Sequence, residues 1–322
     1  MVTIRRLGYL AVVIGFAQVV FGAIVRITGS GMGCGDHWPD CYGSFTPAQG
    51  GSNLLVEISH RYGAAALSLA IVALVGVAWL KRNESGVGGA GGVLRPSLLA
   101  ILLVIVAALF GAVTVKMELS AWVVVTHLAI AMSLLAVLVI VVVRAGGFGA
   151  GTVPARYART MRSGRAAAGL TFLILVFGAL TANTPGAAVA CQGFPWCRGI
   201  TVSGAPLYIQ VTHRILAVLL LGHLIGIVVG VRKRGETRAV RIAASTALGI
   251  VILQVLVAAA MVEMHLPATL RSLHQTVGTA LWISVVTLAA LAAGTHGMTD
   301  IERIVYDSPS RGEFATPEGV AT

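Results

Sequence analysis

Charged residues are scarce in this chain. Asp, Glu, Lys and Arg together make up 11% of its 322 residues, whereas hydrophobic residues make up 57%. The mean hydropathy of +0.89 lies well above the range of soluble domains. This shortage of charge excludes an ordinary water-soluble fold, and the sequence predicts a protein that lives in a lipid bilayer.

Acidic residues are the scarcer charged class, with 12 Asp and Glu against 23 Lys and Arg and a net charge of +11. Nucleic-acid binding would need the basic residues on one soluble face. Instead, 17 of the 23 lie at the termini or in alternate connections between apolar runs, as the positive-inside rule expects of cytoplasmic segments. We therefore predict a multi-pass protein of the cell membrane with both termini in the cytoplasm, contact with anionic lipids and no nucleic-acid partner.

Eight apolar runs come close to the roughly twenty residues that a membrane-spanning helix needs. The first run follows Arg5 and Arg6 as in a signal peptide, but it is too long for one and no small-residue cleavage site follows it. The sequence therefore predicts an all-α integral membrane fold. The expected spans are residues 7–27, 54–80, 96–115, 120–143, 167–184, 206–231, 242–263 and 268–293.

Only four cysteines are present, and all of them lie in two predicted outer loops. Cys34 and Cys41 lie between the first two helices, and Cys191 and Cys197 lie between the fifth and sixth. Disulfides persist on this oxidising side of the membrane, so we expect pairing within each loop. A thiol pair that cycles during turnover is the alternative. Zinc binding is disfavoured because neither pair has the C-x2-C spacing.

Two short segments, Glu57-Ile-Ser-His60-Arg61 and Gln210-Val-Thr-His213-Arg214, almost repeat each other. His213 follows His60 by 153 residues, and His274 follows His127 by 147 residues. An even number of helices in each copy gives both copies the same orientation, which predicts a parallel repeat of two pseudo-symmetric four-helix bundles. The predicted parts are an N-terminal half at 1–143, a cytoplasmic linker at 144–165, a C-terminal half at 166–295 and a polar cytoplasmic tail at 296–322.

In each half, one of these histidines lies on the second helix and one on the fourth, at a depth of about 10 Å from the outer surface. Ionisable groups inside a membrane are costly and usually functional. Two imidazoles that face each other across a helix bundle suit the axial positions of a haem iron. No Cys, Asp or further His lies at the spacing that a bare metal ion would need. An interhelical hydrogen bond is the alternative for any single histidine, and His223, whose repeat counterpart is Ala70, is expected to make only such a contact.

Glu57 stands on the same helix face as His60 because the two are three residues apart. Its counterpart is Gln210, which cannot transfer a proton. This difference predicts a catalytic N-terminal half, with Glu57 as a general base or proton relay, and an electron-transfer C-terminal half. The alternative is that Glu57 only pairs with Arg61.

Several arginines lie at the outer helix ends, near the histidines. Guanidinium groups form strong pairs with carboxylates, so these side chains are candidates for binding haem propionates. The candidates are Arg26, Arg61, Arg214 and Arg271.

The chain resembles the haem A synthases over residues 1 to about 295. The resemblance implies that a ring methyl of haem O is oxidised to the formyl group of haem A, that His60 and His127 hold this substrate haem, and that His213 and His274 hold a permanent haem b. The motifs that carry it are Arg26-Ile-Thr-Gly-Ser-Gly-Met-Gly-Cys34 with Trp38-Pro39 and Cys41, Glu57-x-x-His60-Arg61, His127, Cys191-x-x-x-Pro195-Trp196-Cys197, Gln210-x-x-His213-Arg214 and His274.

The resemblance also implies partnership with the enzyme that makes haem O and supply of haem A to a terminal oxidase. No motif identifies the electron donor, and the sequence leaves the oligomeric state, including a homo-oligomer, open. Two other functions are alternatives. A di-haem b-type electron-transfer cytochrome is disfavoured because such relays place their haems at two depths. A transporter with parallel repeats is disfavoured because no paired Gly or Pro interruptions mark the midplane.

Overall fold

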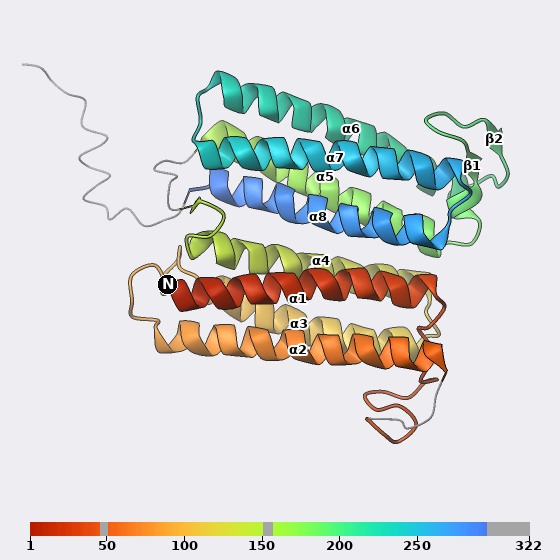
Figure 1. Cartoon of the computed structure of the whole chain (residues 1–322), viewed down its shortest axis with the longest axis horizontal. Helices are drawn as coiled ribbons and strands as arrows, with labels where there is room; N and C mark the ends of the chain where they lie inside the picture. Colours follow the sequence, from red (N-terminus) through yellow and green to blue (C-terminus); the bar gives the residue numbers. More distant parts are fainter. Residues whose placement is uncertain (46–50, 151–156, 295–322) are drawn as a thin grey trace, which may run out of the picture.

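The computed structural model describes residues 1–45, 51–150 and 157–294, and within these ranges it contains eight helices long and apolar enough to cross a membrane (Figure 1). The predicted all-α membrane fold is therefore confirmed. The predicted tail at 296–322 lies outside the described residues. The helices are α1 (Val2–Ile27), α2 (Ser52–Leu80), α3 (Leu94–Lys116), α4 (Ala121–Arg144), α5 (Ala158–Asn183), α6 (Ala205–Lys233), α7 (Arg238–Glu263) and α8 (Ala268–Ala292).

The helices pack in two groups that follow the chain. In the first group α1 packs on α2 and α4, and α3 packs on α2 and α4; in the second, α5 packs on α6 and α8, and α7 packs on α6 and α8. The groups meet where α4 contacts α5 and α8 and where α1 contacts α8. Figure 1 shows α2 and α6 at the two opposite edges of the molecule. This packing is consistent with the predicted pair of four-helix bundles.

The repeat is also visible in the backbone of two outer turns, one between α3 and α4 and one between α7 and α8. Each turn places two successive non-glycine residues at positive φ: Glu118 and Leu119 in the first half, and His265 and Leu266 in the second. In each turn, the second of these residues donates its N–H to the carbonyl five residues earlier, at 3.0 Å in the first half and 2.8 Å in the second. The sequence alignment at 147 residues therefore corresponds to matching local structure.

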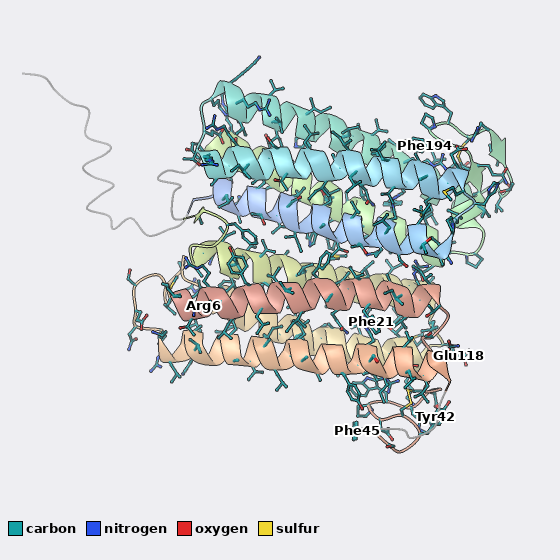
Figure 2. The ribbon with its side chains drawn as sticks, in the orientation of Figure 1. Arg6, Phe21, Tyr42, Phe45, Glu118 and Phe194 are labelled. Atoms are coloured by element: carbon teal, nitrogen blue, oxygen red, sulfur yellow. A yellow bond between two sulfur atoms is a disulfide. The ribbon has the colours of Figure 1, made fainter. Side chains whose placement is uncertain are left out.

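The outer loops gather at one end of the bundle, and the connections α2–α3 and α6–α7 lie at the other. Figure 2 shows Tyr42 and Glu118 at the loop end and Arg6 at the opposite end. Basic residues concentrate at the Arg6 end, as the predicted topology requires.

One helix starts much earlier than the sequence indicated. The fifth span was expected from residue 167, but α5 begins at Ala158. Its first two turns carry Arg159, Arg162 and Arg165, which lower the local hydropathy without breaking the helix. Long basic side chains can extend towards the polar membrane surface from such a helix end. Part of the predicted linker at 144–165 is therefore helical.

A buried tryptophan links the two halves. Trp282 on α8 is 5% exposed and donates its indole N–H to the backbone carbonyl of Met132 on α4, at 2.8 Å. Its ring also lies 5.8 Å from that of Phe172 on α5. Trp282 therefore contributes both packing and a directed hydrogen bond to the contact between the halves.

We expect Trp282→Phe to lower the stability of the purified protein by about 1 kcal/mol, because one interhelical hydrogen bond is lost. Thermal unfolding in detergent measures this. The matched control is Trp122→Phe on α4, where the side chain is 57% exposed to the lipid region. Equal effects of the two substitutions would show that the hydrogen bond between the halves has no special weight.

Candidate functional site

The four paired histidines occupy matching positions on their helices. His60 and His213 are the ninth residues of α2 and α6, and His127 and His274 are the seventh residues of α4 and α8. All four therefore lie within two to three turns of the helix ends that carry the outer loops. The symmetric depth predicted from the sequence is present.

The imidazoles of His213 and His274 face each other, with ring centroids 6.4 Å apart and an angle of 69° between the rings. Two imidazoles on opposite sides of one metal ion would have their centroids roughly 6 Å apart, given metal–nitrogen bonds of about 2.0–2.1 Å. Nδ1 of His213 lies 3.0 Å from the carbonyl oxygen of Ile174. Because a carbonyl only accepts, Nδ1 donates, and the lone pair of Nε2 remains available for a metal.

His60 lies in a tight environment between α1 and α2. A Cβ atom on Gly22 would lie 3.1 Å from Cε1 of His60, and the ring stacks on Phe21 at 6.2 Å. In the second half, Gly178 of α5 approaches His213 in the same way, with 3.0 Å to Cε1. These two glycines are 156 residues apart, so the repeat also includes the close approach of a helix backbone to the imidazole.

Several buried polar atoms near the histidines have no hydrogen-bond partner among the described residues: Nδ1 of His127, Oε1 of Gln254 and Nε of Arg271. The backbone of Ala107 lies near His127 without closing a hydrogen bond of ordinary geometry. Buried polar groups without partners are rare in proteins and often mark a bound group. The described part of the chain contains no cluster of three or more His, Cys, Asp or Glu side chains that could hold a bare metal ion. Pairs of histidines fit haem, because the porphyrin supplies the other ligands of the iron.

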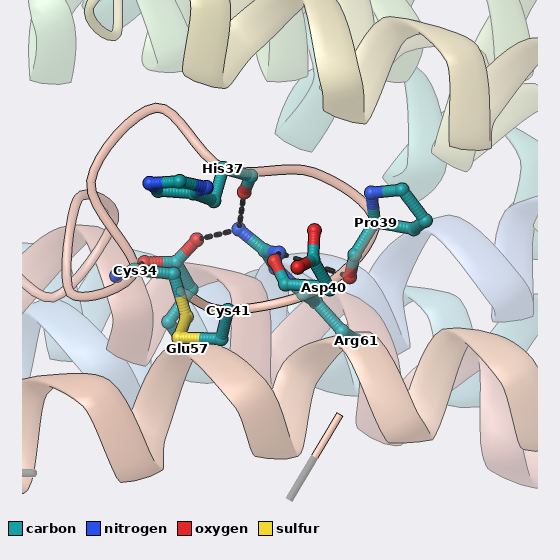
Figure 3. Close-up of polar contacts among 7 residues, drawn as sticks. All are labelled: Cys34, His37, Pro39, Asp40, Cys41, Glu57 and Arg61. Atoms are coloured by element: carbon teal, nitrogen blue, oxygen red, sulfur yellow. Dashed lines mark hydrogen bonds and ion pairs between the residues drawn. A yellow bond between two sulfur atoms is a disulfide. The ribbon is translucent and has the colours of Figure 1, made fainter. Parts of the chain in front are cut away.

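Glu57 and Arg61 fasten the first outer loop to α2 (Figure 3). Oε2 of Glu57 accepts the backbone N–H of Cys34 at 2.9 Å, and Oε1 pairs with Arg61. Glu57 is 4% exposed, so this contact is buried. The pairing with Arg61, which the sequence offered as the alternative role of Glu57, is present, and both carboxylate oxygens are engaged. Arg61 also donates to the loop carbonyls of His37 at 2.9 Å, Asp40 at 2.7 Å and Pro39 at 3.1 Å.

Gln210 and Arg214 fasten the second outer loop in the same way. Oε1 of Gln210 accepts the N–H of Cys191 at 2.6 Å. Arg214 donates to the carbonyls of Cys191 at 2.9 Å and Gly193 at 2.8 Å. This loop contains the short antiparallel strands β1 (Cys191–Gln192) and β2 (Gly199–Ile200). The Glu-to-Gln difference between the halves therefore leaves the loop anchor unchanged.

Both predicted disulfides are present, Cys34–Cys41 in the first loop and Cys191–Cys197 in the second. Each disulfide includes the cysteine whose backbone N–H is bound by Glu57 or Gln210. The loops are thus held at a fixed position over the outer ends of the histidine-bearing helices.

An ion pair ties each loop to a second helix, with the charges reversed between the halves. Lys116 at the end of α3 lies 3.4 Å from Asp36 and lowers the pKa of this exposed carboxyl. Glu263, which is 147 residues after Lys116 and ends α7, pairs with Arg198. Exposed pairs of this kind contribute little to stability. Their value is in limiting where the loops can lie.

The four candidate arginines differ in how they are engaged. The guanidinium groups of Arg61 and Arg214 donate to loop carbonyls. Arg26 reaches across to the second half, where Nη1 donates to the carbonyl of Ala182 at 3.2 Å. Arg271 lies close enough to Arg26 for the two charges to repel, and its Nε has no partner among the described residues. Arg26 and Arg271 therefore retain the capacity to bind an anion.

His223 makes the isolated contact that the sequence predicted. Its Nε2 lies 2.9 Å from the carbonyl oxygen of Ser163. The ring lines a cavity of about 560 Å³ between α5 and α6 with Thr160 and Arg234. This cavity lies towards the end of the bundle opposite the outer loops, away from the paired histidines.

The sequence model of the COX15-CtaA family, described as cytochrome oxidase assembly protein, matches residues 5–286. The chain belongs to this family. It is 30% identical over 278 residues to the haem A synthase of Lysinibacillus sphaericus, which covers 82% of this chain and 87% of the relative. It is 29% identical over 226 residues to the haem A synthase of Exiguobacterium sibiricum, and this alignment covers 67% of this chain and 72% of the relative. A 55-residue segment, 17% of the chain, is 46% identical to part of the protoheme IX farnesyltransferase of Thermus thermophilus, 9% of that protein.

Sequence reasoning missed two glutamines beside the histidines of this COX15-CtaA chain. Gln18 on α1 contacts His60, and Gln254 on α7 contacts His274. Neither belongs to the motif around a histidine, and they are not counterparts in the repeat. The only signal was a polar residue in the middle of an apolar span.

We expect Gly178→Val to reduce the haem content of the purified protein, because a side chain there would push His213 out of its position. Gly169→Val on the same helix is the matched control, since nothing lies within 4 Å of a Cβ atom at Gly169. The haem-to-protein ratio measures both. If the two variants lose haem equally, the close approach of α5 to His213 is irrelevant to binding.

Proposed function

We propose that this chain is a haem A synthase, which oxidises a ring methyl of haem O to the formyl group of haem A for haem-A-containing terminal oxidases. The observation that carries the proposal is the family match over residues 5–286, because it includes both histidine pairs and both anchored loops. The haem A synthases among the relatives support the same activity.

We assign substrate haem to His60 and His127 and a permanent haem b to His213 and His274. The difference in acid supports this assignment, since Glu57 lies beside the first pair and the neutral Gln210 beside the second. Bound between His213 and His274, haem b would supply one-electron transfer. The predicted division into a catalytic half and an electron-transfer half follows from this assignment.

The proposed reaction removes four electrons from the methyl carbon. With dioxygen as the oxidant, the net balance is R–CH3 + O2 → R–CHO + H2O, and the alcohol R–CH2OH forms after the first two electrons have left. Protons leave the carbon in both stages. The protein must therefore provide a proton acceptor near the substrate, inside a region that excludes water.

Glu57 is the residue we propose as that proton acceptor or relay. It stands one turn from His60, and its carboxylate is bound by Arg61 and by the N–H of Cys34. These contacts make Glu57 a loop anchor as well. The two roles are compatible, because the anchor needs only an acceptor oxygen, as Gln210 demonstrates, whereas proton transfer needs the acid.

Arg26 and Arg271 are the residues we propose for binding propionates. Their guanidinium groups lie at the junction of the two halves, and neither forms an ion pair among the described residues. Arg61 and Arg214 could contribute only with the donors that the loop carbonyls leave free.

We propose that the protein lies in the cell membrane with both termini in the cytoplasm, on the evidence of the basic inner segments. A reporter that is active only in the cytoplasm, fused to the C-terminus, tests this orientation.

We also propose cooperation with the haem O synthase. One segment of the chain is similar to part of a protoheme IX farnesyltransferase, the type of enzyme that makes haem O, and this similarity supports the proposal. Haem O is also too hydrophobic to diffuse freely through water, so direct transfer from one enzyme to the other would be favourable. The basic inner segments would suit an acidic electron-transfer partner.

Haem extraction from the purified protein, expressed with and without a source of haem O, tests the proposed activity. We expect haem B alone without the source. With the source, we expect haem O with its alcohol, aldehyde or haem A product as well. If haem B fills both sites under both conditions, the protein is an electron-transfer cytochrome and the proposed activity is wrong.

We expect Glu57→Gln to retain haem binding and to lose most formyl product, or to stop at the alcohol. The anchor should survive, because Gln210 already holds the equivalent loop through its amide oxygen. The control is Asp36→Asn, which removes an exposed acid from the same loop. Product analysis by mass measures both, and full haem A formation by Glu57→Gln would exclude the proton-transfer role.

A further inference from the structure

The four paired histidines are not held alike. His213 donates a hydrogen bond from Nδ1 to a backbone carbonyl, and His60 and His274 are each contacted by a glutamine from a neighbouring helix. Nδ1 of His127 is buried and makes no hydrogen bond among the described residues. The first half thus has one firmly held and one loosely held imidazole, whereas both imidazoles of the second half are firmly held.

Gln18 restrains His60 from the face of its ring. The amide Nε2 donates to the backbone carbonyl of His60 at 2.8 Å and lies 3.0 Å from Nδ1 and 3.4 Å from Nε2 of the ring. Because it is almost equally far from two ring nitrogens, the amide lies over the ring rather than along either lone pair. Gly63, one turn after His60, provides the space, since a Cβ atom there would overlap Oε1 of Gln18. The contact fixes the ring and leaves its metal-binding nitrogen free.

Gln254 restrains His274 with the same geometry. Its Nε2 donates to the backbone carbonyl of His274 at 3.0 Å and lies 3.1 and 3.2 Å from the two ring nitrogens. A Cβ atom on Gly278, again one turn after the histidine, would lie 3.3 Å from this amide. The same arrangement of glutamine, imidazole and glycine therefore occurs at two positions that the repeat does not relate.

The two glutamines are not related by the repeat. The counterpart of Gln254, 147 residues earlier, is Ala107, which has no side-chain donor and meets His127 only through its backbone. The counterpart of Gln18 is Ile174 under the 156-residue offset that relates Gly22 to Gly178. Ile174 instead offers its backbone carbonyl to His213. His127 therefore has no side-chain donor and no hydrogen bond of ordinary geometry, only a looser contact with the backbone of Ala107.

We propose that Gln18 and Gln254 are positioning residues for haem ligation, and that His127 is the exchangeable ligand of the substrate haem while the other three histidines stay bound. This inference rests on the proposed haem sites. Contacts behind a metal-binding histidine fix its orientation and are typically worth about 10–100-fold in metal affinity. An exchangeable ligand would let a small molecule bind to the reacting haem. Two firmly held ligands would prevent a small molecule from binding to the electron-transfer haem.

Carbon monoxide is the probe for this difference, because it binds reduced haem only where an axial ligand can leave. The protein is loaded with haem b in both halves and reduced. We expect about one carbon monoxide to bind per two haems. His127→Ala should retain both haems and the same stoichiometry, whereas His60→Ala should lose the haem of the first half. The reverse behaviour of these two variants, or equal behaviour, would overturn the proposal.

The glutamines are tested by a matched pair of substitutions. We expect Gln18→Leu to weaken haem binding in the first half by about 10–100-fold. Gln254→Leu should allow His274 to leave the haem of the second half, so that carbon monoxide binds to both haems. The haem spectrum of the unaltered half reports whether each variant is folded. If folded variants retain the affinity and stoichiometry of the parent protein, the glutamines do not position the ligands.

Haem A formation in the parent preparation separates this inference from the proposed function. If no haem A forms but the carbon monoxide pattern is as expected, the proposed function fails and the inference about the ligands stands. If haem A forms but His60 proves to be the exchangeable ligand, the inference fails alone.

Discussion

Polar groups inside the membrane must find their partners within the protein, and this constraint shapes the outer part of the bundle. Four imidazoles lie two to three turns deep, where the bilayer offers them no hydrogen bonds. Glycines at 22 and 178 bring neighbouring helix backbones against the rings of the α2 and α6 histidines, and amides or carbonyls restrain three of the four. The surroundings of each histidine are therefore built by neighbouring helices as much as by its own.

The anchored loops explain how a duplicated unit could diverge in chemistry while keeping its shape. Glu57 and Gln210 perform the same task, each accepting the N–H of the first cysteine of its loop. An amide oxygen and a carboxylate oxygen both accept that bond, and the charged carboxylate accepts it more strongly. The carboxylate alone can also carry a proton, so one half can provide acid–base chemistry without any change of fold.

Much of the fold followed from the sequence because its signals are local or periodic. Apolar runs located all eight helices, and the spacing between His60 and His213 exposed the repeat. The early start of α5 escaped detection because Arg159, Arg162 and Arg165 lower hydropathy while remaining compatible with a helix. The roles of Gln18 and Gln254 could not be predicted because each glutamine contacts a histidine on another helix. These contacts depend on the tertiary packing of α1 on α2 and of α7 on α8, which the sequence does not reveal. The engagement of Arg61 and Arg214 by loop carbonyls was equally invisible, since a motif does not reveal which donors are already taken.

The arrangement of the helices determines which of the four histidines lie near the junction of the two halves. The histidines of α4 and α8 lie on helices that pack against each other at the junction of the halves, whereas α2 and α6 lie at opposite edges (Figure 1). The loosely held His127 is therefore on a helix that meets the second bundle, and the firmly held His274 is on the facing helix. Trp282 and Arg26 each bond across this same junction. These two contacts help to hold the histidine pairs at a fixed separation, which the proposed electron transfer between the halves would require.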